Sequence, residues 1–235
     1  ITPIYFANEA VGGTIENMEN VKTILIDADD TVLDFAKAQH GSFFAACDKL
    51  GFSCTDEQYE DYDEINKKYW RMLERGEISK SRLIIARFEE FFAKYGIKAD
   101  AEEMEDAYRE FLGVQYHFVD GAEEGLKYLK SKYKIYVITN GIKDTQENRI
   151  EKSGFINYVD GVFISEAIGA EKPSKEFFDY VFDHSDAKRE TSVVIGDSLT
   201  SDIKGGINAN VRTIWFNGKH KDNDGKIIPD YVVYD

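Results

Sequence analysis

The stretch that decides the fold is VKTILIDADDT, residues 21–31. It begins as a short apolar run rich in β-branched side chains, and such a run predicts a buried strand. The strand ends at Asp27, and Asp29 follows two residues later. Ligands of an open parallel sheet bind beyond the carboxyl ends of its strands. These residues therefore predict both a first strand and the place of a site.

After residue 120 the chain alternates between predicted helices and strands. This alternation implies parallel βαβ units. Several of the strands are apolar on both faces, as strands covered by helices on both sides must be. The sequence therefore predicts a doubly wound, Rossmann-like α/β core. The predicted strands are residues 134–141, 158–165, 191–197 and 211–217, with a possible last strand shortly before the chain stops at residues 232–235. The predicted helices are residues 121–133, 143–154, 175–185 and 201–210.

Between the first strand and this core, residues 36 to about 116 carry apolar side chains at helical spacing. Four successive helices predict a small antiparallel bundle inserted into the α/β core. Ser79 and Asp100 are candidate helix N-caps, and Glu103 follows Asp100 at the spacing of a capping box. The predicted helices are residues 36–51, 55–76, 79–96 and 100–113. The predicted domains are a core of residues 18–34 and 118–235, an insert of 35–117, and an N-terminal extension of 1–17 that ends before Met18.

The composition excludes several classes of partner. The 235 residues include 29 Lys and Arg against 44 Asp and Glu, for a net charge of −15. This charge disfavours nucleic acids and anionic membranes as partners, but local cations can still hold a small phosphorylated substrate. No apolar run reaches the roughly 18 residues of a membrane helix, and the first residues do not resemble a secretory signal. We therefore expect a cytoplasmic protein.

The two cysteines, Cys47 and Cys54, form no CxxC pair, and the four histidines are scattered. This spacing disfavours both a zinc site and a disulfide framework. We expect two thiols that are buried or take no part in function, which fits a reducing cytoplasm.

Polar residues gather where the predicted strands end. Asp197 joins Asp27 and Asp29 from a neighbouring strand, and three carboxylates in one place repel one another unless a cation neutralises them. Hard oxygen ligands suit Mg²⁺, so we expect Mg²⁺ as the cofactor. The remaining candidate residues are Thr139, Asn140 and Gly141 after one strand, Lys172 before Pro173, and Ser198 and Asp202 after Asp197.

This set of groups is chemically complete for phosphate transfer. A carboxylate beside Mg²⁺ stays ionised and can attack phosphorus, which makes Asp27 the candidate nucleophile. A second carboxyl group can protonate the leaving oxygen and then activate water. Thr139, the N–H groups near Gly141 and Lys172 supply donors for the phosphoryl oxygens. The residues therefore indicate a phosphatase that passes through an aspartyl-phosphate.

The same residues resemble the four motifs of the haloacid dehalogenase superfamily: DADDT after a strand, TNG, a lysine before proline, and GDSLTSD. The resemblance implies that Asp27 is nucleophile and metal ligand, and that Asp29 is general acid and base with its carbonyl on the metal. It implies phosphoryl binding by Thr139 and Lys172, a metal ligand at Asp197, and a supporting role for Asp202. The helical insert resembles the cap of that superfamily.

A finer resemblance, to bacterial pyrimidine 5′-nucleotidases, is carried by DADDTVLDF, the insert segment INKKYWRMLERGEISKSRL and GDSLTSDIKGGINAN. It implies a nucleotide as substrate. Phe35, Asn66, Tyr69 and Trp70 are then candidates for substrate contact, although aromatic residues at helical spacing are also what a bundle core requires.

Three alternatives stay open. A phosphosugar phosphatase or mutase would keep the fold, and a regulatory module would keep the pocket without turnover. Phosphonate hydrolysis of the superfamily's type would need a Schiff-base lysine among Lys67, Lys68 and Lys80, where we expect solvated side chains. Carbon–halogen cleavage is disfavoured, because dehalogenases of the superfamily lack the second aspartate of the first motif and this chain has Asp29.

Overall fold

The structure, a computed structural model, describes residues 20–234, so the predictions for residues 1–17 and Met18 lie outside the described part. Within residues 20–234, six parallel strands form one sheet in the order β3-β2-β1-β4-β5-β6. The sequence order reverses beside β1, as in doubly wound folds. The strands are β1 (Thr23–Ile26), β2 (Lys134–Thr139), β3 (Gly161–Ile164), β4 (Ser192–Gly196), β5 (Arg212–Phe216) and β6 (Tyr231–Val233).

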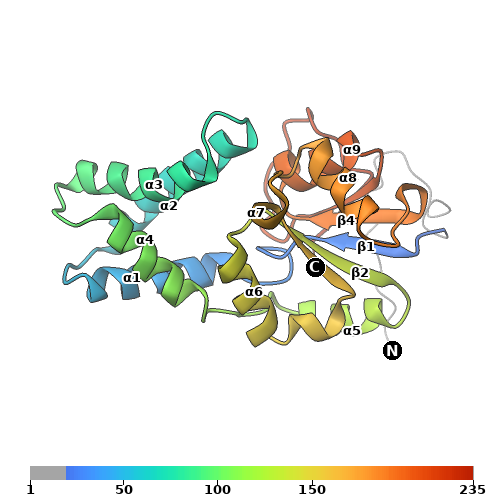
Figure 1. The fold of residues 1–235 in the computed structure, drawn as a ribbon, viewed down its shortest axis with the longest axis horizontal. Coiled ribbons are helices and arrows are strands. Elements are labelled where there is room, and N and C mark those ends of the chain that lie inside the picture. Colours follow the sequence, from blue (N-terminus) through green and yellow to red (C-terminus); the bar gives the residue numbers. More distant parts are fainter. Residues whose placement is uncertain (1–19, 235) are drawn as a thin grey trace.

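Helices cover both faces of the sheet (Figure 1). Successive strand residues point to opposite faces. Ile24 of β1 therefore packs with Leu126 on one face, and Leu25 packs with Phe177 on the other. One layer holds α5 (Ala122–Lys130) and α6 (Lys143–Lys152) with the turn η2 (Phe155–Tyr158). The remaining helices and turns of the sheet domain are α7 (Ser165–Ile168), α8 (Lys175–Asp183), η3 (Arg189–Thr191), η4 (Leu199–Ile203) and α9 (Lys204–Asn208).

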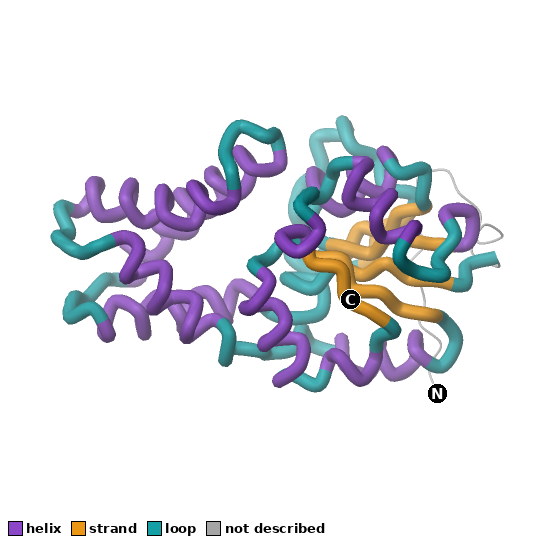
Figure 2. Tube along the Cα trace, viewed as in Figure 1, coloured by secondary structure: helices purple, strands orange, loops and turns teal. Residues whose placement is uncertain are grey.

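Four helices between β1 and α5 form a separate helical bundle beside the sheet, drawn in Figure 2 as purple helices joined by teal loops. They are α1 (Phe35–Lys49), α2 (Asp56–Glu74), α3 (Lys80–Tyr95) and α4 (Ala101–Leu112). Stacked and edge-to-face rings fill the bundle interior, with Tyr62 between Phe43 and Phe88. The predicted fold class, a doubly wound parallel sheet with an inserted helical bundle, is confirmed, while the exact boundaries at residues 35 and 117 stay a prediction.

The N-caps of the bundle differ in one respect from those predicted. Ser79 and Asp100 do cap α3 and α4, and Asp100 accepts from the N–H groups of Glu102 and Glu103. The reciprocal capping box, however, forms at the start of α2. There Thr55 Oγ1 accepts from the Gln58 N–H at 3.2 Å, and Gln58 Oε1 accepts from the Thr55 N–H at 2.9 Å. Thr-x-x-Gln is itself a capping-box signature in the sequence.

The two chain segments that connect the bundle to the sheet run side by side. The Asp34 N–H donates to the His117 carbonyl at 2.8 Å, and the Val119 N–H donates to the Val32 carbonyl at 2.9 Å. Leu33 forms a bridge with Phe118 between these two hydrogen bonds. The bundle therefore leaves and rejoins the sheet at one paired point.

Cys47 and Cys54 are both free thiols, with their sulfur atoms 3.8 Å apart at the α1–α2 end of the bundle. Burial raises the pKa of the Cys47 thiol well above its usual range. In the part of the chain that the structure describes, no helix combines the length and apolar character needed to cross a membrane.

Candidate functional site

The site lies where β1 and β4, which are neighbours in the sheet, both end. Asp27 follows β1 and Asp197 follows β4, so parallel pairing brings the two residues to the same edge. Among the described residues, Asp27, Asp197 and Asp202 each offer a carboxylate oxygen within 4.8 Å of the other two. The structure thus brings together three of the aspartates that the sequence analysis selected.

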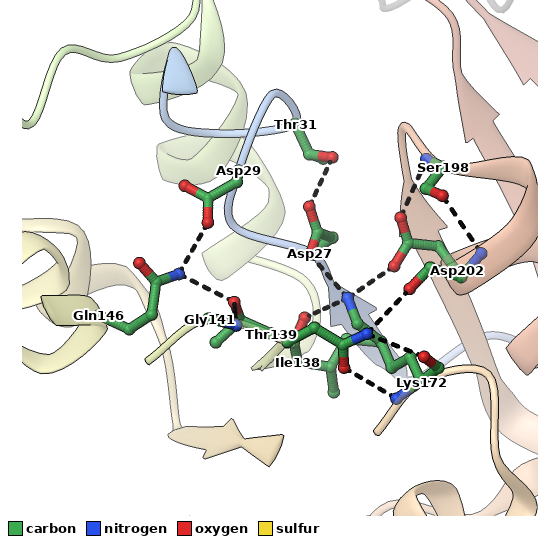
Figure 3. Close-up of polar contacts among 12 residues, drawn as sticks. Asp27, Asp29, Thr31, Ile138, Thr139, Gly141, Gln146, Lys172, Ser198 and Asp202 are labelled. Atoms are coloured by element: carbon green, nitrogen blue, oxygen red, sulfur yellow. Dashed lines mark hydrogen bonds and ion pairs between the residues drawn. The ribbon is translucent and has the colours of Figure 1, made fainter. Parts of the chain in front are cut away.

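Lys172 is the cation at the centre of this cluster (Figure 3). Its Nζ lies 2.7 Å from Asp27 Oδ1 and 2.6 Å from Asp202 Oδ1, and it also donates to the Ile138 carbonyl at 2.8 Å. The side chain is 2% exposed. A buried ammonium with three acceptors has its hydrogen-bonding capacity filled.

Burial and charge act on these groups in opposite directions. Burial raises the pKa of Asp27, and the neighbouring carboxylates add to that, while the Lys172 ammonium opposes it. Burial also raises the pKa of Asp197, to about 6. Burial would lower the pKa of Lys172, but Asp202 and Asp27 outweigh it and hold the pKa above its ordinary value. The site favours an ammonium and disfavours a full set of carboxylates, so a further cation would stabilise it.

Asp202 is held by an unusual turn. An ordinary helix is predicted over residues 201–210, but η4 is a π-helical turn in which the Ile203 N–H donates to the Ser198 carbonyl. Asp202 Oδ2 then accepts from the Ser198 N–H at 3.0 Å. A Cβ atom on Gly196 would lie 2.3 Å from the Asp202 carboxylate, so only glycine at that position lets Asp202 lie against β4.

The loop after β2 lies on the other side of Lys172. Thr139 is buried, and the Gly141 N–H donates to its Oγ1 at 3.1 Å. Asn140 is joined to the backbone of Lys172 twice: its Nδ2 donates to the Lys172 carbonyl and its Oδ1 accepts from the Lys172 N–H, both at 2.8 Å. Asn140 therefore fixes the lysine loop against the β2 loop.

Asp29 is held by two residues of α6 that the sequence analysis did not select. Gln146 Nε2 donates to Asp29 Oδ2 at 3.0 Å and to Thr139 Oγ1 at 2.8 Å. The fully buried Arg149 forms an ion pair with the other Asp29 oxygen. Gln146 and Arg149 stand three residues apart, the spacing of one helix face, which was the signal available in the sequence.

Two lysines after β5 were also not selected. Lys219 Nζ lies 2.6 Å from Asp30 Oδ2, and Lys221 Nζ lies 2.7 Å from Asp197 Oδ2. Both side chains line the same cavity as Asp27. They add positive charge beside Asp30 and Asp197.

The cavity over the site has a volume of about 540 Å³ and continues into the helical bundle. Three of the four substrate candidates line it, namely Phe35, Asn66 and Trp70. Tyr69 instead packs against the bundle core and donates to Glu90 at 3.0 Å. The predicted phosphate-binding and metal-binding residues, Thr139, Asn140, Gly141, Ser198 and Asp202 among them, also line it.

A buried polar network forms the bundle side of this cavity. Asn66 Oδ1 accepts from Trp70 Nε1 at 3.1 Å and from Arg87 at 2.8 Å, and Asn66 Nδ2 donates to Gln39 Oε1 at 2.9 Å. The second terminal nitrogen of Arg87 lies 2.5 Å from Glu105 Oε2, and both side chains are 2% exposed. The charge of Arg87 is thus balanced inside the protein.

The donor set fits a magnesium ion. Asp27 and Asp197 are carboxylates from two neighbouring strands, burial raises the pKa of both, and hard oxygen atoms are the ligands that Mg²⁺ takes. The described residues place no histidine or cysteine in the acidic cluster, so a soft-metal site is disfavoured.

The sequence profile of the haloacid dehalogenase-like hydrolases matches residues 24–216, which span β1 through β5 and every group described above except Lys219 and Lys221. The chain belongs to this hydrolase family. As a haloacid dehalogenase-like hydrolase it is an enzyme, and its six-stranded parallel sheet is the fold of its solved relatives.

Three relatives cover nearly the whole hydrolase. The crystal structure of the HAD-hydrolase YfnB from Bacillus subtilis, bound to magnesium and described as revealing interdomain movement, has a TM-score of 0.87 and 35% identity over 91% of this chain and 94% of that one. The pyrimidine 5′-nucleotidase PynA of Streptococcus pneumoniae is 34% identical over 91% of each chain. The pyrimidine 5′-nucleotidase YjjG of Escherichia coli is 30% identical over 89% of this chain and 92% of its own.

Proposed function

We propose that this hydrolase is a magnesium-dependent phosphatase of nucleoside monophosphates, with pyrimidine nucleotides preferred, that works through an aspartyl-phosphate on Asp27. The observation that carries the proposal is the buried Lys172 ammonium between Asp27 and Asp202, at the floor of a cavity that reaches the bundle. The names of PynA and YjjG and the magnesium in the YfnB structure support the substrate and the metal.

The residues divide the reaction between them. The Asp27 carboxylate attacks phosphorus, and the bond from phosphorus to the leaving oxygen breaks while Asp29 gives that oxygen a proton. Asp29 then takes a proton from water, which attacks the aspartyl-phosphate and releases phosphate and free Asp27. Lys172 and the N–H groups after Thr139 stabilise the charge on the phosphoryl oxygens. Magnesium, held by Asp27, the Asp29 carbonyl and Asp197, would supply further charge neutralisation.

The bundle side of the cavity supports a nucleoside as leaving group. Phe35 and Trp70 offer aromatic faces, and Asn66 offers an amide in the same cavity. Because Arg87 is balanced by Glu105, the wall around Asn66 is polar but charge-matched. Such a wall favours an uncharged planar group with hydrogen-bonding edges over a second phosphate or carboxylate. We therefore infer that the bundle acts as the cap that selects a nucleobase.

The decisive experiment is phosphate release from a panel of pyrimidine and purine nucleoside monophosphates and sugar phosphates, with Mg²⁺ and with EDTA. We expect release that requires Mg²⁺ and is fastest with pyrimidine monophosphates. Equal or faster release from sugar phosphates would reject the nucleotide assignment and keep the chemistry. Interconversion of sugar phosphates without phosphate release would favour a mutase, and inertness toward every ester would reject a phosphatase.

The nucleophile is tested by Asp27→Asn. An amide oxygen cannot form the aspartyl-phosphate, so we expect turnover to fall by about three orders of magnitude or more. Asp183→Asn, an exposed change at the end of α8, is the matched control and should keep wild-type turnover. Near-normal hydrolysis by Asp27→Asn would show that another group is the nucleophile.

A further inference from the structure

Lys80 departs from the expectation for lysines of the bundle. The α2–α3 end of the bundle is the end that points toward the sheet domain (Figure 1), and Lys80 is the first residue of α3. Its side chain is only 9% exposed, whereas lysine is almost never buried unless it is paired. The prediction that Lys80 is a solvated lysine was wrong.

The acceptors of Lys80 all belong to the sheet domain. Its Nζ donates to the Asn140 carbonyl at 2.8 Å and to Ser165 Oγ at 2.7 Å, and the Gly141 carbonyl lies at 3.4 Å. Glu171 Oε2 lies 3.0 Å away and completes an ion pair. One side chain of the bundle thus binds three separate segments around the site.

The two carbonyl contacts fix the direction of the groups that face the cavity. In a trans peptide the carbonyl of one residue and the N–H of the next point in opposite directions. With the Asn140 and Gly141 carbonyls turned toward Lys80, the N–H groups of Gly141 and Ile142 point away from it, and that of Gly141 donates to Thr139 Oγ1. Asn140, Gly141 and Ile142 all line the cavity over Asp27, and Lys80 is not among its lining residues.

Lys80 also contacts two residues that adjoin Lys172. Glu171, its ion-pair partner, directly precedes Lys172 in the chain, and Asn140, its carbonyl partner, holds the backbone of Lys172 through two hydrogen bonds. The other two lysines considered for a Schiff base pair within the bundle: Lys67 with Asp63 and Glu64, and Lys68 with Glu90.

We propose that Lys80 is a positioning residue, which orients the peptide groups after Thr139 and the Lys172 loop for phosphoryl binding when the helical bundle closes on the sheet domain. This role rests on the proposed phosphatase activity and is independent of which ester is the substrate. It also differs from a Schiff-base role, because the Lys80 ammonium faces backbone carbonyls and Glu171 instead of the cavity.

Lys80→Met tests the proposal with p-nitrophenyl phosphate and Mg²⁺, since methionine keeps length and apolar contact but removes the ammonium. A charge-assisted hydrogen bond is worth about 1.5–3 kcal/mol, so we expect kcat to fall by about 10- to 100-fold. KM should change little, because the contact acts on the closed, reacting state. Lys80→Arg, which keeps a cation, should recover part of the loss, and Lys68→Met is the matched control that should behave as wild type.

Glu171→Gln is a second test, which changes the same ion pair from the side of the sheet domain. It should lower kcat in the same direction, and its effect should be smaller in the Lys80→Met background than in wild type, because the two residues act through one ion pair. An unchanged kcat in Lys80→Met, or a loss that follows a lower melting temperature and that Lys80→Arg does not reduce, would overturn the proposal. Inactivity of the wild-type enzyme toward every ester would instead reject the phosphatase itself.

Discussion

Arg149 shows how much of the site depends on one residue outside the motifs. Its guanidinium binds Asp29, donates to the Gln115 carbonyl at 3.0 Å, and lies 5.5 Å from the centre of the Phe35 ring. Gln115 and Phe35 belong to the two segments that enter and leave the bundle. Arg149 therefore connects Asp29, the proposed general acid, to the end of the bundle that joins the sheet domain.

We expect Arg149→Met to lower kcat by about 10- to 100-fold, because Asp29 loses a buried charged partner that sets its orientation. Steady-state kinetics with a nucleoside monophosphate would measure it, and Lys152→Met, an exposed change on the same helix, serves as control. If Arg149→Met kept the wild-type kcat, the orientation of Asp29 would have to be set by Gln146 alone.

Residues at strand ends could be predicted from the sequence, and residues that act from helices could not. Asp27 and Asp197 each follow an apolar run directly, so the sheet alone places them. Arg149 and Lys80 reach the site only through the rotation of α6 and the position of the bundle, which no local pattern specifies. For Lys80 the sequence even favours a solvated side chain, because lysine on a helix is ordinarily exposed.

At the scale of elements, the capping box at Thr55 starts the longest helix of the bundle, α2. Thr55→Ala leaves the first-turn N–H groups without their side-chain acceptor, so we expect a loss of about 1 kcal/mol in the free energy of unfolding. Urea unfolding would measure this difference. Ser53→Ala, an exposed change in the same loop, is the control, and equal stability of the two variants would contradict a role for the capping box.

The predicted helices and long strands are present because their periodicity extends over many residues. The short elements were missed for the opposite reason. Helix α7 has four residues, too few for a periodic pattern, and the π-helical turn η4 depends on a hydrogen bond from Ile203 to Ser198 and on the space beside Gly196. Such a turn belongs to the tertiary structure and is common at functional sites.

In the whole molecule, Lys80 contacts the sheet domain, so the bundle is closed over the site at its α2–α3 end. We expect the leaving group of the proposed reaction to pass this end when it leaves the cavity. We predict hinges near Asp34–Phe35 and His117–Gly121, the two connecting segments, because hinge motion concentrates in a few terminal residues.

A reversible crosslink between Ser79→Cys and Glu166→Cys, with Cys47 and Cys54 replaced by alanine, should hold the bundle closed. We expect nucleotide turnover to stop and to return when a reducible linker is cleaved, since product release requires opening. The uncrosslinked double-cysteine variant is the control. Undiminished turnover by the crosslinked enzyme would show that substrate does not enter past this end.

The paired connections at Asp34–His117 and Val32–Val119 also bear on ancestry and engineering. A segment whose two ends meet can be removed or inserted at a single point of the surface without rerouting the rest of the chain. Recombination could therefore exchange the whole bundle as a unit. The same catalytic sheet domain would then acquire a different leaving-group preference in a single genetic event. Chimaeras that graft another relative's bundle between these two segments are the natural route to new specificities on an unchanged reaction centre.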